Sequence, residues 1–265
     1  MNAPQADLSG WTCAPFSGGG YSHDVYRRGN GPGVVLIPEM PGLTPEVLAL
    51  GNHLVDNGFT VAAPSLFGTP GAAAIRPGTA AVLARGCVTK EFAAFATNKK
   101  RPVADFLRAL ARDLNETTPG KGVGVIGQCF TGGFALAAAV DDSVLAPVLS
   151  QPSVPLPLTA AQRRDPGVSE DELKIVERRA ADEGLCAMGL RFSRDPMAPA
   201  ERFQTLKDRL GDAFEVIELD SGPGNQGGFG RMAHSVLTLE VREQDGQAAY
   251  EARKRVVEFL TSRLG

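Results

Sequence analysis

The chain has 265 residues, of which 43% are hydrophobic and 22% are charged, and its net charge is −3. This composition is typical of a soluble globular protein with one α/β domain, or at most two small ones, and the weak negative charge excludes the basic surface of a protein that binds nucleic acid or anionic membranes. No apolar run is long enough to span a bilayer, and the N-terminus lacks the basic and apolar regions of a signal peptide. Because the four cysteines are scattered, they fit neither a zinc site nor a disulfide framework, and we predict a cytoplasmic protein without a bound metal or cofactor.

The first half of the chain predicts a parallel sheet. We expect residues 1–20 to be irregular and residues 22–28 to form an edge strand. The continuous apolar runs at 34–37 and 59–63 predict central parallel strands, with an amphipathic helix at 44–57 between them.

The pattern weakens at 69–100, where prolines and glycines interrupt short alanine-rich pieces. We predict a lid or an insertion beside the functional site there. A clear helix is expected at 102–115, with Pro102 in its first turn.

The second half alternates strands and helices. The segment 169–183 predicts a helix, with Ser169 as N-cap and Glu172 completing a capping box. The other expected elements are strands at 144–149, 185–192 and 213–219, a proline-rich loop at 150–167, a helix at 198–210, a glycine-rich loop at 221–231 and a helix from about 247 to 264. Such alternation predicts one α/β domain over residues 1–265, with a mostly parallel sheet and helices on both faces.

The stretch GVGVIGQCFTGGFALAAAV at 122–140 reads as a strand, a tight turn and a helix. Cys129 sits in the turn between small residues, which is the nucleophile-elbow pattern with Cys in place of Ser. A buried structural cysteine is the alternative. A glycine pattern typical of dinucleotide binding is also present, but it lies within the strand, and no P-loop lysine follows.

An elbow nucleophile needs a base and an acid that follow it in the chain. Of the three histidines, only His234 follows Cys129, and it sits in a loop after the last strand. Asp195 ends the preceding strand, and it could also cap a helix before Pro196, a role compatible with that of the acid. Asp220 is the rival acid one strand later.

The end of the first long apolar strand carries Glu39 and Met40. Glu39 is either a solvated carboxylate or a partner of the Cys129 thiol. The backbone N–H groups of Phe130 and Met40 are the candidates for an oxyanion hole.

The four segments GQCFTGG, IPEMPG, RFSRDP and AHS together resemble the dienelactone hydrolase family, and the resemblance runs from about Tyr21 to the C-terminus. The family implies an α/β-hydrolase fold, with Cys129, Asp195 and His234 as a catalytic triad. It also implies that Glu39 pairs with the thiol until substrate displaces it.

The resemblance implies a cofactor-free hydrolase of small carboxylic esters or lactones, which would form an acyl-thioester on Cys129. Thr131 and Thr238 stand where this family has a glycine and a substrate-binding arginine, so Arg76, Arg85 and Arg231 are the candidates to bind a substrate carboxylate. A non-catalytic binding protein and a thiol redox protein remain alternatives, and we expect a monomer or a small homo-oligomer.

Overall fold

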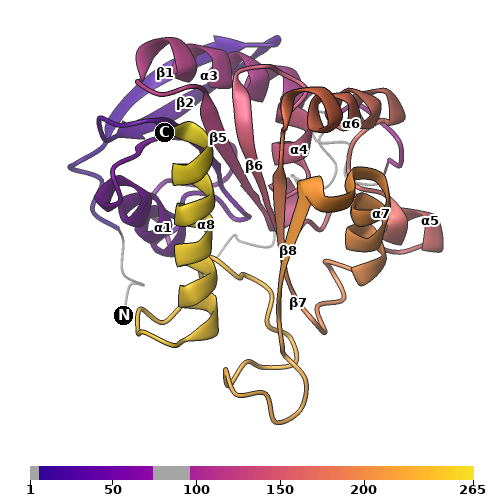
Figure 1. The fold of residues 1–265 in the computed structure, drawn as a ribbon. Helices are drawn as coiled ribbons and strands as arrows, with labels where there is room; N and C mark the ends of the chain where they lie inside the picture. The colour runs from indigo at the N-terminus through magenta and orange to yellow at the C-terminus, as the bar shows by residue number, and fades with distance from the viewer. Residues whose placement is uncertain (1–5, 74–95) are drawn as a thin grey trace.

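The computed structural model describes residues 6–73 and 96–265, and an eight-stranded sheet runs through its centre (Figure 1). The sheet order is β1-β2-β4-β3-β5-β6-β7-β8. The strands from β4 to β8 are parallel, while β1 and β2 are antiparallel at one edge. The strands are β1 (Thr12–Gly18), β2 (Tyr21–Arg28), β3 (Gly33–Ile37), β4 (Thr60–Pro64), β5 (Val123–Gln128), β6 (Val144–Ser150), β7 (Ala187–Phe192) and β8 (Phe214–Leu219).

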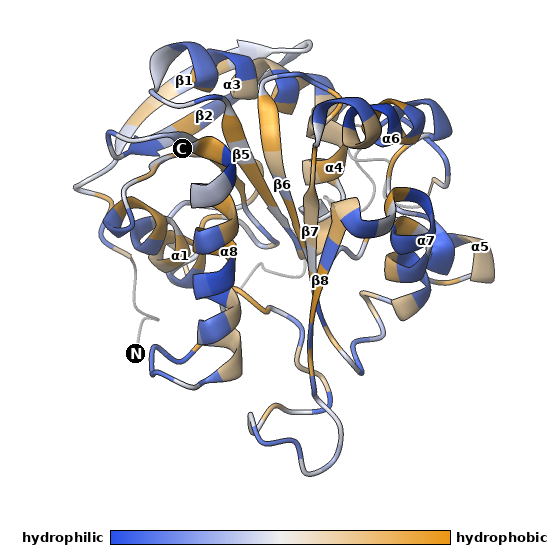
Figure 2. Cartoon of the chain, viewed as in Figure 1, coloured by the Kyte–Doolittle hydropathy of each residue, from blue (hydrophilic) through white to orange (hydrophobic). Residues whose placement is uncertain are grey.

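Helices cover both faces of the sheet, as the sequence predicts. The helices are α1 (Pro45–Asp56), α3 (Val103–Thr117), α4 (Phe134–Ala138), α5 (Ala160–Arg164), α6 (Glu170–Glu183), α7 (Ala200–Leu210) and α8 (Ala248–Leu264), with 3-10 turns η1 (Cys129–Thr131) and η2 (Gly211–Ala213). In β3, Val34 and Leu36 face the core layer under α1 and α8, and Val35 and Ile37 face the layer under α3, α4, α6 and α7. Figure 2 accordingly shows apolar central strands between helices whose outer sides are polar.

The N-terminal edge differs from the prediction. Residues 1–20 were expected to be irregular, but β1 pairs antiparallel with β2, so β2 is not the edge strand. Most residues of β1 are exposed, so it lacks the alternation of buried and exposed residues that reveals a strand. Pro15 in β1 is tolerated because an edge strand has one side without ladder hydrogen bonds.

Two other boundaries also differ. The segment 150–167 contains the short helix α5, which begins after the capping residue Thr159. Helix α7 begins at Ala200 instead of residue 198. The predicted capping box of α6 is confirmed, because Ser169 and Glu172 bond each other's backbone N–H groups.

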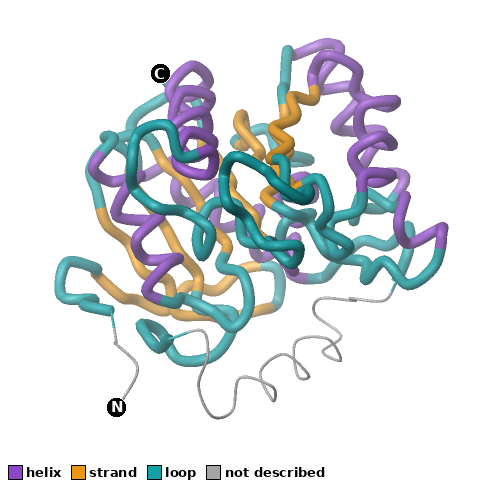
Figure 3. The backbone as a smooth tube through the Cα atoms, turned by 90° about the horizontal axis from the view of Figure 1, so that it is seen from below, coloured by secondary structure: helices purple, strands orange, loops and turns teal. Residues whose placement is uncertain are grey.

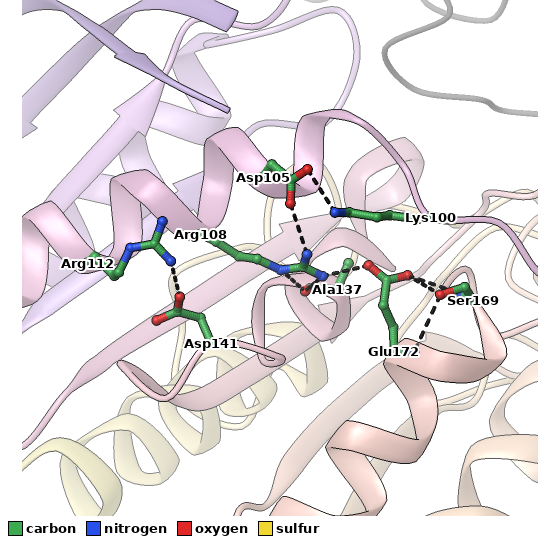
Figure 4. A network of polar contacts seen from close by, with 8 residues as sticks. All are labelled: Lys100, Asp105, Arg108, Arg112, Ala137, Asp141, Ser169 and Glu172. Carbon is green, nitrogen blue, oxygen red and sulfur yellow. Dashed lines mark hydrogen bonds and ion pairs between the residues drawn. The ribbon is translucent and has the colours of Figure 1, made fainter. Parts of the chain in front are cut away.

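A polar network joins α3 to the last turn of α4 and to the first turn of α6 (Figure 4). Arg108 of α3 donates to the Ala137 carbonyl at 2.6 Å and to the Glu172 carboxylate at 2.6 Å. It also pairs with Asp105 on its own helix. The helices that back the Cys129 turn are thus held by charged hydrogen bonds as well as by apolar packing.

Loops gather at the carboxyl ends of the parallel strands, at the bottom of Figure 1, and Figure 3 views the molecule from that side. In open α/β sheets this edge is where ligands bind. None of the helices in the described part of the chain is apolar over a length sufficient to cross a bilayer.

Candidate active site

Cys129 occupies a strained turn directly after β5. Its φ is 50°, a left-handed conformation that is uncommon for a residue other than glycine. Thr131 stabilises the turn, since its hydroxyl oxygen accepts from the Gln128 N–H at 3.0 Å. The same hydroxyl lies 3.2 Å from the Pro38 carbonyl, so Thr131 also ties the turn to the end of β3.

The glycines around Cys129 are required by close approach. A Cβ on Gly127 would lie 2.3 Å from the Thr131 carbonyl oxygen, and a Cβ on Gly132 would lie 2.5 Å from the Cα of Pro152. Both distances are far below van der Waals contact. The strand–turn–helix expected of a nucleophile elbow is therefore present, although its helix begins as the 3-10 turn η1 before α4.

His234 lies between Asp195 and Cys129. Its Nδ1 is 2.6 Å from Oδ2 of Asp195, which leaves Nε2 for the Cys129 thiol. Asp195 is buried, and its other carboxylate oxygen accepts from the Met197 N–H at 2.9 Å. The acid is thereby held from one side while it orients the imidazole from the other.

The electrostatics of this cluster favour a protonated imidazole. Burial lowers the pKa of His234, but hydrogen bonds to Asp195 and to Cys129 and their negative charges outweigh it and raise the pKa to about 11. An imidazolium beside a sulfur favours the thiolate over the thiol.

Neither the capping role of Asp195 nor the rival acid Asp220 matches the structure. Asp195 does not cap α7, since the N-cap of that helix is Pro199. The rival Asp220 is exposed and accepts from Ser193 at 3.3 Å and from the Gly222 N–H at 2.8 Å. Among the described residues, Asp195 is the only carboxylate that has a hydrogen bond with His234.

Glu39 is buried, which excludes the solvated alternative. Its Oε2 accepts from Ser235 at 2.8 Å and from the Gln151 amide at 3.4 Å, while its Oε1 accepts from Thr238. Burial raises the pKa of Glu39 above its ordinary value, and the hydrogen bonds from Thr238 and Ser235 and the nearby His234 oppose that rise.

The predicted pairing of Glu39 with the thiol therefore differs from the structure. In the part of the chain that the structure describes, Glu39 has no hydrogen bond with Cys129, and its two oxygens accept instead from the hydroxyls of Ser235 and Thr238. The Cys129 sulfur lies instead 3.6 Å from Oγ of Ser153.

The two backbone N–H groups predicted to form an oxyanion hole belong to the residue after Cys129 and to the loop after β3. Phe130 is buried in the turn η1, and Met40 is half-buried in the loop after β3, which the hydrogen bond from the Gly42 N–H to the Glu39 carbonyl closes at 2.8 Å. The Met40 N–H has no acceptor among the described residues. The function of both groups remains a prediction.

Of the three candidate arginines, only Arg231 lies in the part of the chain that the structure describes. Arg76 and Arg85 lie outside the described residues, as does most of the predicted lid at 69–100. Arg231 is exposed and lines, with Arg194, a pocket of about 430 Å³ along the loop after β8. Neither Cys129 nor His234 lines that pocket.

Sequence reasoning did not single out Ser153, Gln151 and Ser235. The first two follow β6, the strand beside β5, so their position at a carboxyl end next to the elbow was a usable signal. Gln151 also has a positive φ of 35°, a strain that no sequence pattern predicts. Among residues 6–73 and 96–265, no three His, Cys, Asp or Glu side chains form a group that could hold a metal ion.

The model of the dienelactone hydrolase family matches residues 22–264. No curated protein matches the chain significantly.

Similar solved structures include an esterase from Pyrococcus furiosus, with 14% identity, a TM-score of 0.59 and complete coverage of both chains (100% each). A dienelactone hydrolase from Anabaena variabilis has 12% identity and a TM-score of 0.58 over 96% of this chain and 98% of its own. A dienelactone hydrolase-like promiscuous phosphotriesterase from metagenomic libraries has 16% identity and a TM-score of 0.56 over 99% and 100%. At these identities the likeness establishes the fold, which is that of the α/β-hydrolases.

Proposed function

Because this chain belongs to the dienelactone hydrolase family, we propose that it hydrolyses small carboxylic esters or lactones by nucleophilic catalysis at Cys129. The observation that carries the proposal is the position of His234 between the buried Asp195 carboxylate and the Cys129 sulfur. A nucleophile, a base and a group that orients the base are the parts that acyl transfer requires.

In the first half of the reaction the Cys129 thiolate attacks the ester carbonyl carbon. The oxyanion that forms is bound by the N–H groups of Phe130 and Met40. The protonated His234 then gives its proton to the leaving alcohol, and the acyl group stays on sulfur as a thioester.

In the second half the now neutral His234 takes a proton from water, which attacks the thioester. Collapse of the intermediate releases the carboxylic acid and returns the sulfur to the thiolate and His234 to the imidazolium. Asp195 keeps the imidazole in the orientation and tautomer that both halves need.

A small neutral ester or lactone is the proposed substrate, and no nucleic acid or membrane partner is proposed. The position that binds a substrate carboxylate in this family carries Thr238, whose hydroxyl is bonded to Glu39. The described cysteines, Cys13, Cys129 and Cys186, are free thiols, which supports our proposal of a reducing cytoplasmic compartment.

Turnover of p-nitrophenyl acetate by the wild type, by Cys129→Ala and by His234→Ala tests the proposal. We expect each variant to lose about three orders of magnitude or more in kcat, and the double variant to be little worse than either, because residues that act as one unit are not additive. Mass spectrometry should find the acetyl group on Cys129 after rapid acid quenching. A wild-type rate in folded His234→Ala would refute the assignment.

Two parallel assays separate the alternatives. Consumption of peroxide without ester turnover would identify a thiol redox protein, and neither activity would leave a binding protein. The rates on an anionic lactone and on its neutral methyl ester test the substrate class. Faster turnover of the anionic lactone would contradict the preference for neutral substrates.

A further inference from the structure

The hydroxyl of Ser153 has one partner, and that partner is the candidate nucleophile. Its Oγ lies 3.6 Å from the Cys129 sulfur, within hydrogen-bond reach of the larger sulfur atom. The residue is 2% exposed, and no other group among the described residues bonds its hydroxyl. Buried hydroxyls are normally partnered, so the contact with sulfur is what satisfies this one.

The backbone fixes Ser153 against the nucleophile turn. The Ser153 N–H donates to the Cys129 carbonyl at 2.9 Å. The preceding residue, Pro152, packs so closely on Gly132 that a Cβ there would lie 2.5 Å from the Pro152 Cα. The hydroxyl is thus presented to the sulfur by two rigid contacts with the same turn.

A buried arginine holds the loop from the other side. Arg202 of α7 is 0% exposed and donates to the Pro152 carbonyl at 2.5 Å and to the Pro155 carbonyl at 2.6 Å. These two carbonyls flank Ser153. A bonded carbonyl on each side restricts the backbone, so the loop cannot move Ser153 away from the sulfur without breaking charged hydrogen bonds.

We propose that Ser153 is a further catalytic residue, whose Oγ–H donates a hydrogen bond to the ionised Cys129 sulfur in the resting enzyme. The inference rests on the proposed function, since it adds a second hydrogen-bond donor, after His234, to the sulfur of the proposed nucleophile. The donor is neutral, so it stabilises the thiolate without adding to the charges of His234, Asp195 and Glu39 around the site.

The bond has opposite effects on the two factors that set thiol reactivity. A donor to the thiolate increases the ionised fraction at a given pH, because hydrogen bonding to the charged form favours that form. It also lowers the intrinsic nucleophilicity of the thiolate. Loss of the hydroxyl should therefore move ionisation to higher pH while the fully ionised sulfur reacts as fast or faster.

The test is alkylation of the intact chain by iodoacetamide over a pH series, with the rate at Cys129 read by peptide mass spectrometry. Ser153→Ala removes a hydrogen bond to the charged form of the sulfur, so it should raise the midpoint of the alkylation profile by about one pH unit or more. Ser153→Thr keeps a hydroxyl and should stay near the wild-type midpoint. Ser153→Gly, a second loss of the hydroxyl, should shift like the alanine variant.

Ser221→Ala is the matched control, because Ser221 is a buried serine after β8 whose hydroxyl accepts from the Arg194 N–H at 3.1 Å and does not touch the sulfur. Its midpoint should equal that of the wild type. An unshifted midpoint in folded Ser153→Ala or Ser153→Gly, or an equal shift in Ser153→Thr, would overturn the proposal. Alkylation needs no ester turnover, so failure of the proposed function would be seen separately in the hydrolysis assay.

Discussion

Glu39 and Glu172 are each 5% exposed, yet they face different partners. Glu172 accepts from the Arg108 guanidinium at 2.6 Å, whereas Glu39 accepts from the hydroxyls of Ser235 and Thr238 and from the Gln151 amide. Burial of a charge is costly unless a partner compensates it. At Glu172 a permanent cation compensates the charge, and the network joins three helices (Figure 4).

At Glu39 the compensation is incomplete, and burial raises its pKa. The nearest titratable partner is His234, whose charge changes during the proposed reaction. A buried carboxylate with neutral donors beside a reactive histidine is the kind of perturbed group that gathers at functional sites. The comparison teaches that burial alone does not separate a structural from a functional carboxylate, whereas the identity of its partner does.

Asp195 is a third buried carboxylate, and its partner is the reactive histidine itself. We therefore expect substitution of Asp195 to lower kcat more than any other change considered below. Asp195→Asn should lower kcat by about four orders of magnitude, because an amide favours the wrong tautomer of His234. Asp220→Asn is the matched control and should change kcat little, since within the described residues Asp220 bonds only Ser193 and the Gly222 N–H. Steady-state kinetics on p-nitrophenyl acetate would measure both, and the reverse ranking would move the acid to Asp220.

Arg108→Ala tests the structural member of the comparison, Glu172, by removing the cation that compensates its charge. It leaves Glu172 buried without its cation, which should lower the free energy of unfolding by about 3–5 kcal/mol. The kcat of the folded protein should not change, because Arg108 contacts helices and not the site. Urea unfolding measures the first effect, and kinetics below the unfolding transition measures the second.

Arg112→Ala is the control for that experiment. Arg112 is exposed and pairs with the half-buried Asp141, and loss of a pair that solvent screens in this way should cost about 1 kcal/mol or less. An equal loss of stability in the two arginine variants would mean that the Glu172 charge is not what Arg108 compensates.

Of these substitutions, Glu39→Gln should have the smallest effect. Its clearest test is how the stability difference between wild type and variant changes with pH. Burial raises the pKa of Glu39 above its ordinary value of 4.5. As the pH rises above that value, the unfolded chain releases the proton before the folded protein does, so the folded state loses stability until the pH passes the folded pKa. Glutamine does not titrate, so the wild type should lose stability relative to the variant over this range, as measured by urea unfolding at several pH values.

The same variant should lower kcat by about tenfold, equivalent to roughly 1.4 kcal/mol of transition-state stabilisation, because His234 loses a nearby negative charge. Glu172→Gln is the matched control, and it should lose stability without losing kcat. If the difference in free energy of unfolding between wild type and Glu39→Gln did not change with pH, Glu39 would behave like Glu172.

Much of the fold could be predicted from the sequence because the patterns that indicate it are local. A few neighbouring residues are enough to indicate each of these structures: the apolar runs of β3 and β4, the glycines around Cys129 and the capping box at Ser169. The strand β1 was not predicted, because it has no buried face and so no alternation of apolar and polar residues.

The site was readable only in part. Chain order predicted His234 and Asp195 as base and acid, since the fold constrains where these groups can follow the nucleophile, and the structure shows the two side chains hydrogen-bonded. The neighbours of Glu39 and of the sulfur depend on how loops cross the carboxyl edge of the sheet. Glu39 and Ser235 are 196 residues apart in the sequence, so no local pattern relates them.

The four carbonyls that Arg202 binds, at Pro152, Pro155, Gln162 and Asp165, span almost the whole connection from β6 to α6. Much of that connection is irregular, and segments of this kind usually open on their own, apart from the core. Here an opening would have to withdraw a fully buried guanidinium from α7. The connection and α7 should therefore exchange their amide hydrogens with solvent as one cooperative unit, so that a segment with little secondary structure shares the protection of a helix.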